Sequence, residues 1–330
     1  MGDDLAGSGE SERLPVGRSV VGPWRIGTSN TVAFSRDGRL LAGLGRDVFV
    51  WDVALQSKAV RCHPFAHPSD AAFSPDQRHL AVKSTSGQIV IIDAQSGQTA
   101  VDFKNTADGE GSNLQYSSCG EYIVDGSWSG RLAIRRAGSG AHEFAQEFAG
   151  EMIRSVHSSS DGKRWIIAHG CKATSHDRPP PPDYFSVWVW PFRPGGYRLL
   201  PERVAFARSS ALSPDGAVLA VVHGTPPDMV SVFRLSDGTC VGAVSIRSGG
   251  TGHALGWSAD GRLIGSVQDQ IVVFYAWPTL GRMHELALAY PSDVAFSPYG
   301  DILALGSWQV GWVLPADPLA TTSLPQKPRR

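Results

Sequence analysis

Seven short segments of the chain repeat one pattern, in which Ser-x-Asp-Gly or a close variant separates two apolar strands. The copies are FSRDG at 34–38, FSPDQ at 73–77, YSSCG at 116–120, SSSDG at 158–162, LSPDG at 212–216, WSADG at 257–261 and FSPYG at 296–300. Their last residues are 39, 43, 42, 54, 45 and 39 positions apart. A period in this range indicates stacked copies of one supersecondary unit. The repeat therefore predicts one closed array rather than two separate domains.

The second copy shows what one unit contains. Three short strands are predicted at 71–74, 79–83 and 88–93, with a fourth near 99–103. The segments between them carry the Pro, Asp, Ser and Gly residues that tight turns require. Four strands at this spacing make a four-stranded meander, which must stack on neighbours to bury both of its faces.

The second strand of each copy shows how the units stack. Three residues past the motif, the seven copies hold a large apolar residue, in order Leu41, Leu80, Ile123, Trp165, Leu219, Ile264 and Leu303. The next position is mostly small, and successive strand residues face opposite sides of a sheet. Unrelated strands in a sandwich would not keep this offset in every copy. The pattern predicts an all-β, seven-bladed β-propeller of four-stranded antiparallel sheets.

The seventh copy ends near Leu314 after only three strands. The segment RSVVGPWRIG at 18–27 is an apolar strand without a unit of its own. We expect it to supply the outer strand of the last blade and close the ring, which protects a sheet edge from aggregation. Residues 18–314 then form the propeller, and residues 1–17 and 315–330 form flexible polar tails.

Composition narrows the class of partner and the compartment. With 30 basic and 31 acidic residues the net charge is −1, so nucleic acid is not expected as a partner. The polar, acidic start of the sequence predicts no secretory signal, and no apolar run long enough to span a membrane is expected. Four cysteines without paired spacing predict free thiols and a cytoplasmic location. Arginine outnumbers lysine 24 to 6, which is typical of a GC-rich, bacterial genome.

Residues 32–56, VAFSRDGRLLAGLGRDVFVWDVALQ, resemble a WD-repeat unit, because the Ser-x-Asp-Gly turn is followed by Trp51-Asp52 at the end of the third strand. Ile92-Asp93 takes that place in the second copy. The resemblance spans residues 18–314 and implies a seven-bladed platform for other macromolecules. The family's Gly-His pair is missing, so its buried Asp-His-Ser-Trp network is not expected in any blade. Related propellers cap hydrolases, but a Gly-x-Ser-x-Gly elbow with a plausible triad is absent here.

In the resembling family, the rim that carries the turns between second and third strands binds partners. Trp128 and Trp308 lie in such turns in identical Gly-Ser-Trp contexts, and each is either a partner anchor or packed onto a neighbouring blade. Blade four has a long insertion with four consecutive prolines. This insertion is either a docking element for a partner or a spacer that leans on the ring. The favoured site is a ridge over blades three to five. The candidate partner-binding residues are Trp128, Trp308, Arg46, His169, Pro179, Pro180, Pro181, Pro182, Tyr184, His223 and Asp228.

Two other kinds of site were weighed. Cys171, His176 and Asp177, with His169, lack the paired spacing of a zinc site, so no metal is expected. Polar residues that open the first strands either ring the channel mouth or cap strand ends; they are Asp70, Asn113, Ser155, Ser209 and Asp293. Arg135-Arg136 is expected to be an isolated, solvated pair.

The sequence thus predicts a non-catalytic interaction scaffold without cofactor, which presents its rim to a protein partner. It is expected to be a monomeric ring or a subunit of a larger complex, with no membrane insertion. The alternative is a propeller enzyme or small-ligand sensor that gathers His169, His223, Asp70 and Asp293 at the channel mouth.

Overall fold

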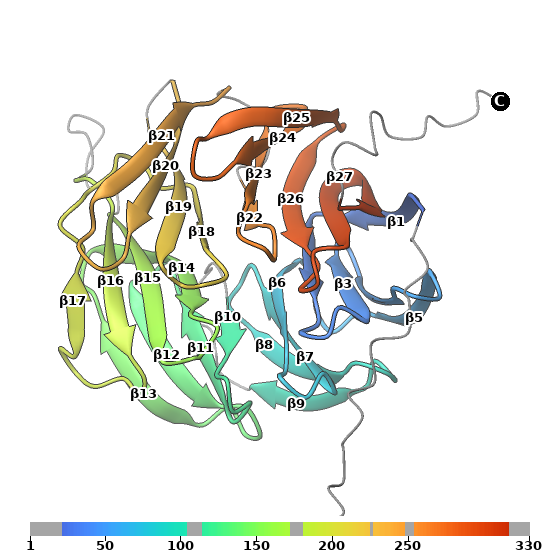
Figure 1. The fold of residues 1–330 in the computed structure, drawn as a ribbon. Coiled ribbons are helices and arrows are strands. Elements are labelled where there is room, and N and C mark those ends of the chain that lie inside the picture. Colours follow the sequence, from blue (N-terminus) through green and yellow to red (C-terminus); the bar gives the residue numbers. More distant parts are fainter. Residues whose placement is uncertain (1–21, 104–113, 172–180, 225–226, 248–253, 317–330) are drawn as a thin grey trace, which may run out of the picture.

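The computed structural model describes residues 22–103, 114–171, 181–224, 227–247 and 254–316. These residues form seven antiparallel sheets arranged as blades around a central axis, as predicted (Figure 1). Each blade is a meander, so its strands follow one another from the axis to the periphery.

The innermost strands, which surround the axis, are β2 (Thr31–Phe34), β6 (Pro68–Phe73), β10 (Leu114–Tyr116), β14 (Glu151–Ser158), β18 (Ser209–Leu212), β22 (Leu255–Trp257) and β26 (Pro291–Phe296). The second strands are β3 (Leu40–Leu44), β7 (His79–Ser84), β11 (Tyr122–Gly126), β15 (Arg164–Cys171), β19 (Val218–His223), β23 (Leu263–Gln268) and the first arm of β27 (Ile302–Pro315).

The third strands are β4 (Val48–Asp52), β8 (Ile89–Asp93), β12 (Arg131–Arg136), β16 (Tyr184–Val189), β20 (Met229–Arg234), β24 (Ile271–Ala276) and the second arm of β27. The outer strands are β5 (Ser57–Cys62), β9 (Thr99–Phe103), β13 (His142–Glu147), β17 (Tyr197–Leu199), β21 (Cys240–Ser245), β25 (Gly281–Ala287) and β1 (Trp24–Ser29).

The ring is closed by the two ends of the propeller, as the sequence predicts. β27 folds back on itself, since the backbone N–H of Ala316 donates to the carbonyl of Asp301 at 2.9 Å. β1 then pairs antiparallel with its second arm, with Trp24 opposite Val313. Blade seven is therefore built from both ends of the described chain, and β1 covers what would otherwise be an open sheet edge.

The repeated motif forms the turn between the first and second strands of each blade. In the first copy the Ser35 hydroxyl donates to Asp37 at 2.7 Å and accepts the N–H of Leu40 at 3.0 Å. Asp37 also accepts the N–H of Arg39 at 3.0 Å. In the seventh copy Tyr299 replaces the aspartate of the motif, and Ser297 donates instead to Asp301 at 2.6 Å.

The last residue of the motif adopts a positive φ in every copy. Six copies use glycine there, and Gln77 takes the same conformation at φ 64° in the second. Only glycine occupies this region without steric cost, which explains why the turn selects it.

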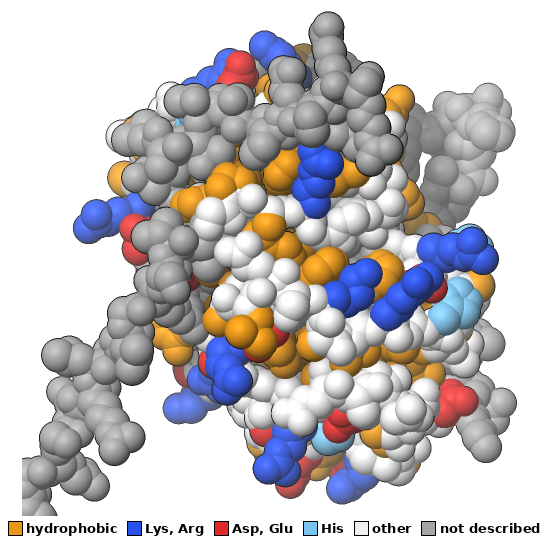
Figure 2. All heavy atoms as spheres, turned by 90° about the vertical axis from the view of Figure 1, so that its right-hand side faces the viewer, with side chains coloured by type: hydrophobic (Ala, Val, Ile, Leu, Met, Phe, Trp, Pro, Cys, Tyr) orange, Lys and Arg blue, Asp and Glu red, His pale blue; other side chains and the backbone are white. Residues whose placement is uncertain are grey.

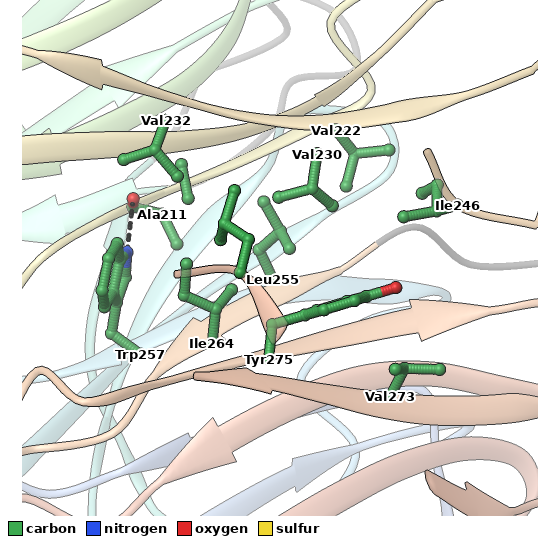
Figure 3. Close-up of a cluster of buried hydrophobic side chains, with 12 residues drawn as sticks. Ala211, Val222, Val230, Val232, Ile246, Leu255, Trp257, Ile264, Val273 and Tyr275 are labelled. Atoms are coloured by element: carbon green, nitrogen blue, oxygen red, sulfur yellow. Dashed lines mark hydrogen bonds between the residues drawn. The ribbon is translucent and has the colours of Figure 1, made fainter. Parts of the chain in front are cut away.

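The hydrophobic core is divided among the blade interfaces. Figure 3 shows one of them, where Val222, Val230 and Val232 of blade five face Leu255, Trp257 and Ile264 of blade six. The large second-strand residues predicted to pack between blades are all buried. Each should contribute about 1.5–3 kcal/mol to the stability of the fold.

All four cysteines are free thiols. No helix in the described part of the chain is long and apolar enough to cross a membrane.

Ring closure by β1 can be tested by deletion. Removing residues 1–29 should lower the melting temperature, because it takes away Trp24 and Ile26, which are buried in the interface of blades seven and one. Removing residues 1–16 leaves β1 in place and should change the melting temperature little. Equal melting temperatures in a calorimetric scan of both deletions would contradict this role.

Gly216→Ala should destabilise the protein by about 1–2 kcal/mol, because φ at this position is +66° and an added Cβ would lie 3.3 Å from the Cβ of Ser159. Gly138→Ala is the matched control, since nothing lies within 4 Å of its added Cβ. Urea unfolding followed by tryptophan fluorescence gives both values. The explanation is wrong if the two variants lose the same stability.

Candidate functional site

The rim of second-to-third-strand turns presents two tryptophans. Trp128 is 41% exposed and Trp308 is 52% exposed. Both turns are held by their serines: the Ser127 and Ser129 hydroxyls are 2.5 Å apart, and Ser307 donates to the carbonyl of Ala289 at 2.8 Å. Neither indole is fully packed onto a neighbouring blade. The two residues therefore remain available as contacts.

Trp308 belongs to a larger exposed cluster that the sequence did not predict. The backbone N–H of Trp308 donates to the carbonyl of Tyr290 at 3.1 Å. This bond places the connection from blade six beside the turn of blade seven. Tyr290 is 45% exposed, and Val310 lies two residues beyond Trp308 and is also exposed. We call Tyr290, Trp308 and Val310 the aromatic cluster. The tyrosine of Ala-Tyr-Pro, just before the seventh copy, indicates an aromatic residue in the connection between two blades, whereas the sequence prediction rests on turns within blades.

Three of the predicted contact residues are buried rather than exposed. His169, Tyr184 and Asp228 lie inside the protein, so their side chains do not form part of the rim surface. Asp228 forms an ion pair with Arg208, with 2.5 Å between Nη1 and Oδ2. His169 and Tyr184 stack with ring centroids 4.4 Å apart. The polar residues at the ends of these strands thus stabilise the blade from within.

Blade four contains a buried hydrogen-bond network that the sequence did not predict. His169 Nδ1 lies 3.1 Å from Glu151 and its Nε2 lies 2.7 Å from the Ser186 hydroxyl. Trp188 donates to that same hydroxyl at 2.9 Å. It is not the family's Asp-His-Ser-Trp network, because a glutamate takes the place of the aspartate, and glutamate, histidine and serine come from three adjacent strands of one blade.

The carboxylate of this network is held ionised. Burial opposes the charge of Glu151, but hydrogen bonds with His169 and Tyr184 outweigh it and lower the pKa of the carboxyl group. The Tyr184 hydroxyl donates to Glu151 at 2.6 Å. Both ring nitrogens of His169, the Tyr184 hydroxyl and the Trp188 indole have a partner within the blade, which is typical of a structural network.

The other candidates occupy different places. Arg46 is exposed in the rim turn of blade one, and Pro181 and Pro182 are exposed before β16. His223 is half-buried and lies 2.8 Å from the Ser231 hydroxyl, and burial lowers its pKa. Pro179 and Pro180 lie outside the described residues. The ridge over blades three to five therefore stays a prediction.

The central channel holds two cavities of about 420 and 510 Å³. The larger one is lined mainly by polar residues of the innermost strands, including Asp70, His157, Ser209 and Asp293. Asp70, Ser209 and Asp293 therefore line the channel as predicted, whereas Ser155 is not among its lining residues and Asn113 lies outside the described residues. His169 and His223, which the enzyme alternative gathers at the channel mouth, do not line these cavities either.

These polar residues also connect neighbouring blades. Asp70 of blade two accepts the N–H of Leu114 in blade three at 2.6 Å. Asp293 of blade seven accepts the N–H of Val32 in blade one at 2.8 Å. His157 of blade four lies 2.9 Å from the Ser210 hydroxyl of blade five. For Asp70 and Asp293 both interpretations of the sequence hold, because each side chain lines the channel and also caps a strand of the adjacent blade.

Burial in the channel wall shifts the pKa of the ionisable groups. Desolvation raises the pKa of Asp70 to about 7 and that of Asp293 to about 6. Desolvation also lowers the pKa of His157 to about 4, so this ring stays neutral at physiological pH. The channel thus contains fewer charges than its composition suggests.

No group of three or more His, Cys, Asp or Glu side chains among the described residues is arranged to hold a metal ion. His176 and Asp177, weighed as ligands with His169 and Cys171, lie outside those residues. The Arg135-Arg136 pair is not solvated as expected. Arg135 is buried with Nη1 2.7 Å from His142 Nε2, and only Arg136 is exposed.

The outer face around β1 and β5 is mixed in character. Figure 2 shows Lys and Arg side chains scattered among hydrophobic and neutral ones on this side. Several of these cations cover aromatic rings: Lys58 Nζ lies 4.3 Å from the Phe49 centroid, and the Arg25 guanidinium lies 4.9 Å from that of Trp312. This face therefore shields its aromatic rings, whereas the rim exposes them.

No protein-family model matches the chain, and no curated protein matches its sequence. Among solved structures, 1704 chains match the fold. One is a chain of hydrazine synthase from Kuenenia stuttgartiensis, with a TM-score of 0.72 and 16% sequence identity over 94% of this chain and 100% of that chain. At this identity the similarity establishes the propeller fold alone.

Asp70 should make the stability depend on pH. Its pKa is raised from 3.8 to about 7 on folding, so its contribution to the free energy of unfolding is complete below pH ~4 and is lost as pH rises through 7. As the pH rises from 5 to 8, wild type should therefore lose free energy of unfolding relative to Asp70→Asn. Wild type should lose stability relative to Asp293→Asn in the same way, and this loss should be complete about one pH unit lower.

Urea unfolding at half-unit pH steps measures these differences. The titration of His157 is common to all three proteins and cancels when they are compared. Parallel stability profiles for wild type and Asp70→Asn would show that the carboxyl group has an ordinary pKa.

Proposed function

We propose that the protein is a degenerate WD-repeat-type propeller that acts as a non-catalytic interaction module, with its rim presented to a protein partner. The observation that supports this best is the aromatic cluster. Tyrosine and tryptophan dominate the energetics of protein interfaces, and large exposed rings on a monomer mark interaction sites. Here two exposed aromatic residues, Trp308 and Tyr290, come from segments that a backbone hydrogen bond holds together on the rim.

The turn that carries Trp308 is ordered before any partner binds. The Ser307 hydroxyl accepts the N–H groups of Gln309 at 2.9 Å and Val310 at 3.2 Å. Thr28 of β1 donates to the carbonyl of Gln309 at 2.9 Å. A preorganised anchor loses less conformational entropy on binding, which favours affinity. Trp128 provides a second anchor of the same local design on blade three.

A small polar ligand in the central channel is the second candidate function. The cavity of about 510 Å³ and its polar lining favour it. The carboxylates of Asp70 and Asp293 already accept backbone N–H groups, which supports binding rather than catalysis at this place. Elemental analysis and a screen of polar metabolites by thermal shift would test this candidate.

Free cysteines support a reducing compartment, so we place this function in the cytoplasm of a bacterium. The ring is proposed to work as a monomer or as a subunit of a larger complex.

The rim proposal is tested by paired surface variants. Trp308→Ser with Tyr290→Ser should lower the recovery of specific partners from the native host by at least tenfold, because both anchors are removed. Tyr299→Ser is the matched control, since Tyr299 is 64% exposed on the opposite rim. Quantitative mass spectrometry of affinity-purified samples gives the recovery, and melting temperatures show that each variant is folded. The proposal fails if wild type and the rim variant recover the same proteins equally.

A further inference from the structure

A cavity of about 590 Å³ lies between blades two and three, on the rim of the Ser-x-Asp-Gly turns. Its walls include Ile91 and Val101 of blade two and Tyr116 and Ala137 of blade three. Asp76, His79 and Glu121 lie at its polar edge. It faces the rim opposite the aromatic cluster, so it is independent of the proposed function.

One wall of the cavity is formed by a small residue of blade three, at a position that is tryptophan in blades four and six and alanine also in blades two and seven. Ala137 follows the third strand and donates its N–H to the carbonyl of Glu121 at 2.8 Å. Trp190 in blade four and Trp277 in blade six make the same backbone bond at 2.8 and 2.7 Å. Trp190 packs on Tyr122 of the preceding blade with centroids 5.6 Å apart. Alanine leaves that volume open in blade three.

The hydroxyl of Tyr116 is available to a ligand in this cavity. Tyr116 opens the motif in the third copy and lines the cavity, and its hydroxyl makes no hydrogen bond with any described residue. Trp257 holds the same position in the sixth copy, and its indole donates to the carbonyl of Ala211 at 3.0 Å. The Tyr116 oxygen is not among the buried polar atoms without a partner, so it is accessible and a ligand can bond to it in place of water.

The ionised side chains that line the cavity are carboxylates. None of the described lining residues is Lys or Arg. Glu121 is exposed and forms no ion pair with any described residue. The pKa of Asp76 is lowered mainly by its hydrogen bond from Ser74, so this carboxylate is ionised at neutral pH. Burial raises the pKa of Tyr116, so the phenol stays neutral and can accept a hydrogen bond from a cation.

We propose that this cavity is a binding site for a small amine with an apolar body. The apolar part packs between Val101, Ile91 and the ring of Tyr116. The ammonium group donates to the Tyr116 oxygen and is attracted by Asp76 and Glu121 at the mouth. A cavity of this size holds one small molecule, and the negative mouth selects the amine over an acid of the same shape.

Calorimetric titration of the full chain with tryptamine tests the site, and indole-3-propionate is the probe of matched size and opposite charge. We expect saturable 1:1 binding of tryptamine and at least tenfold weaker binding of the acid. Tyr116→Phe should weaken tryptamine binding about 5–10-fold, the effect of one hydrogen bond that competes with water. Tyr122→Phe, which removes a hydroxyl outside the cavity, should leave the affinity unchanged. Glu121→Gln should reduce the preference for the amine over the acid.

Ala137→Trp should abolish binding, because it places in blade three the side chain that fills this position in blades four and six. Gly138→Leu gives a second way to fill the cavity, since nothing lies within 4 Å of an added Cβ there. The proposal is overturned if folded Ala137→Trp or Gly138→Leu binds tryptamine as wild type does, or if Tyr116→Phe does. It is equally overturned if the acid binds as tightly as the amine, or if neither probe shows saturable binding up to about 10 mM.

Discussion

The structure depends on the burial of apolar surface between neighbouring sheets. Its buried hydrophobic residues fall into seven clusters, and each cluster is shared by two adjacent blades. No blade can satisfy both of its faces alone, so each needs a neighbour on either side. The last interface needs β1, whose Trp24 and Ile26 join residues of blades one and seven. Ring closure by β1 is therefore needed to complete the interface of blades seven and one.

Polar contacts between blades add specificity to this apolar packing. The hydrogen bonds of Asp70, His157 and Asp293 connect innermost strands of adjacent blades near the axis. Farther out, Lys83 of blade two is buried beside Asp125 of blade three and donates to the carbonyl of Gly126 at 2.7 Å. A buried ion pair contributes little net stability, but breaking it would leave an uncompensated charge. Such contacts favour one way of packing the two neighbouring blades over others.

Much of the fold could be predicted because its determinants are local. The Ser35–Asp37 turn and the large residue at Leu41 lie within seven positions of each other, and both recur at fixed offsets. The site residues were harder, because burial depends on contacts between distant parts of the chain. His169 looked like a rim residue from its place at the end of a strand, but Glu151 and Ser186 from the two adjacent strands enclose it. The cavity beside Tyr116 likewise depends on which side chains of two blades meet there, among them the small one of Ala137.

The division of the core into separate interfaces also separates the two proposed surfaces. Tyr116 and Ala137 belong to the cluster of blades two and three, whereas the aromatic cluster lies where blade six meets blade seven. The two sites share no buried cluster, and substitutions at distant sites without common partners act additively. A cavity that lowers packing at one interface therefore does not loosen the turn that holds Trp308. A propeller can in this way keep a rigid rim for a macromolecule and, on its opposite rim, leave one interface incompletely filled for a small ligand.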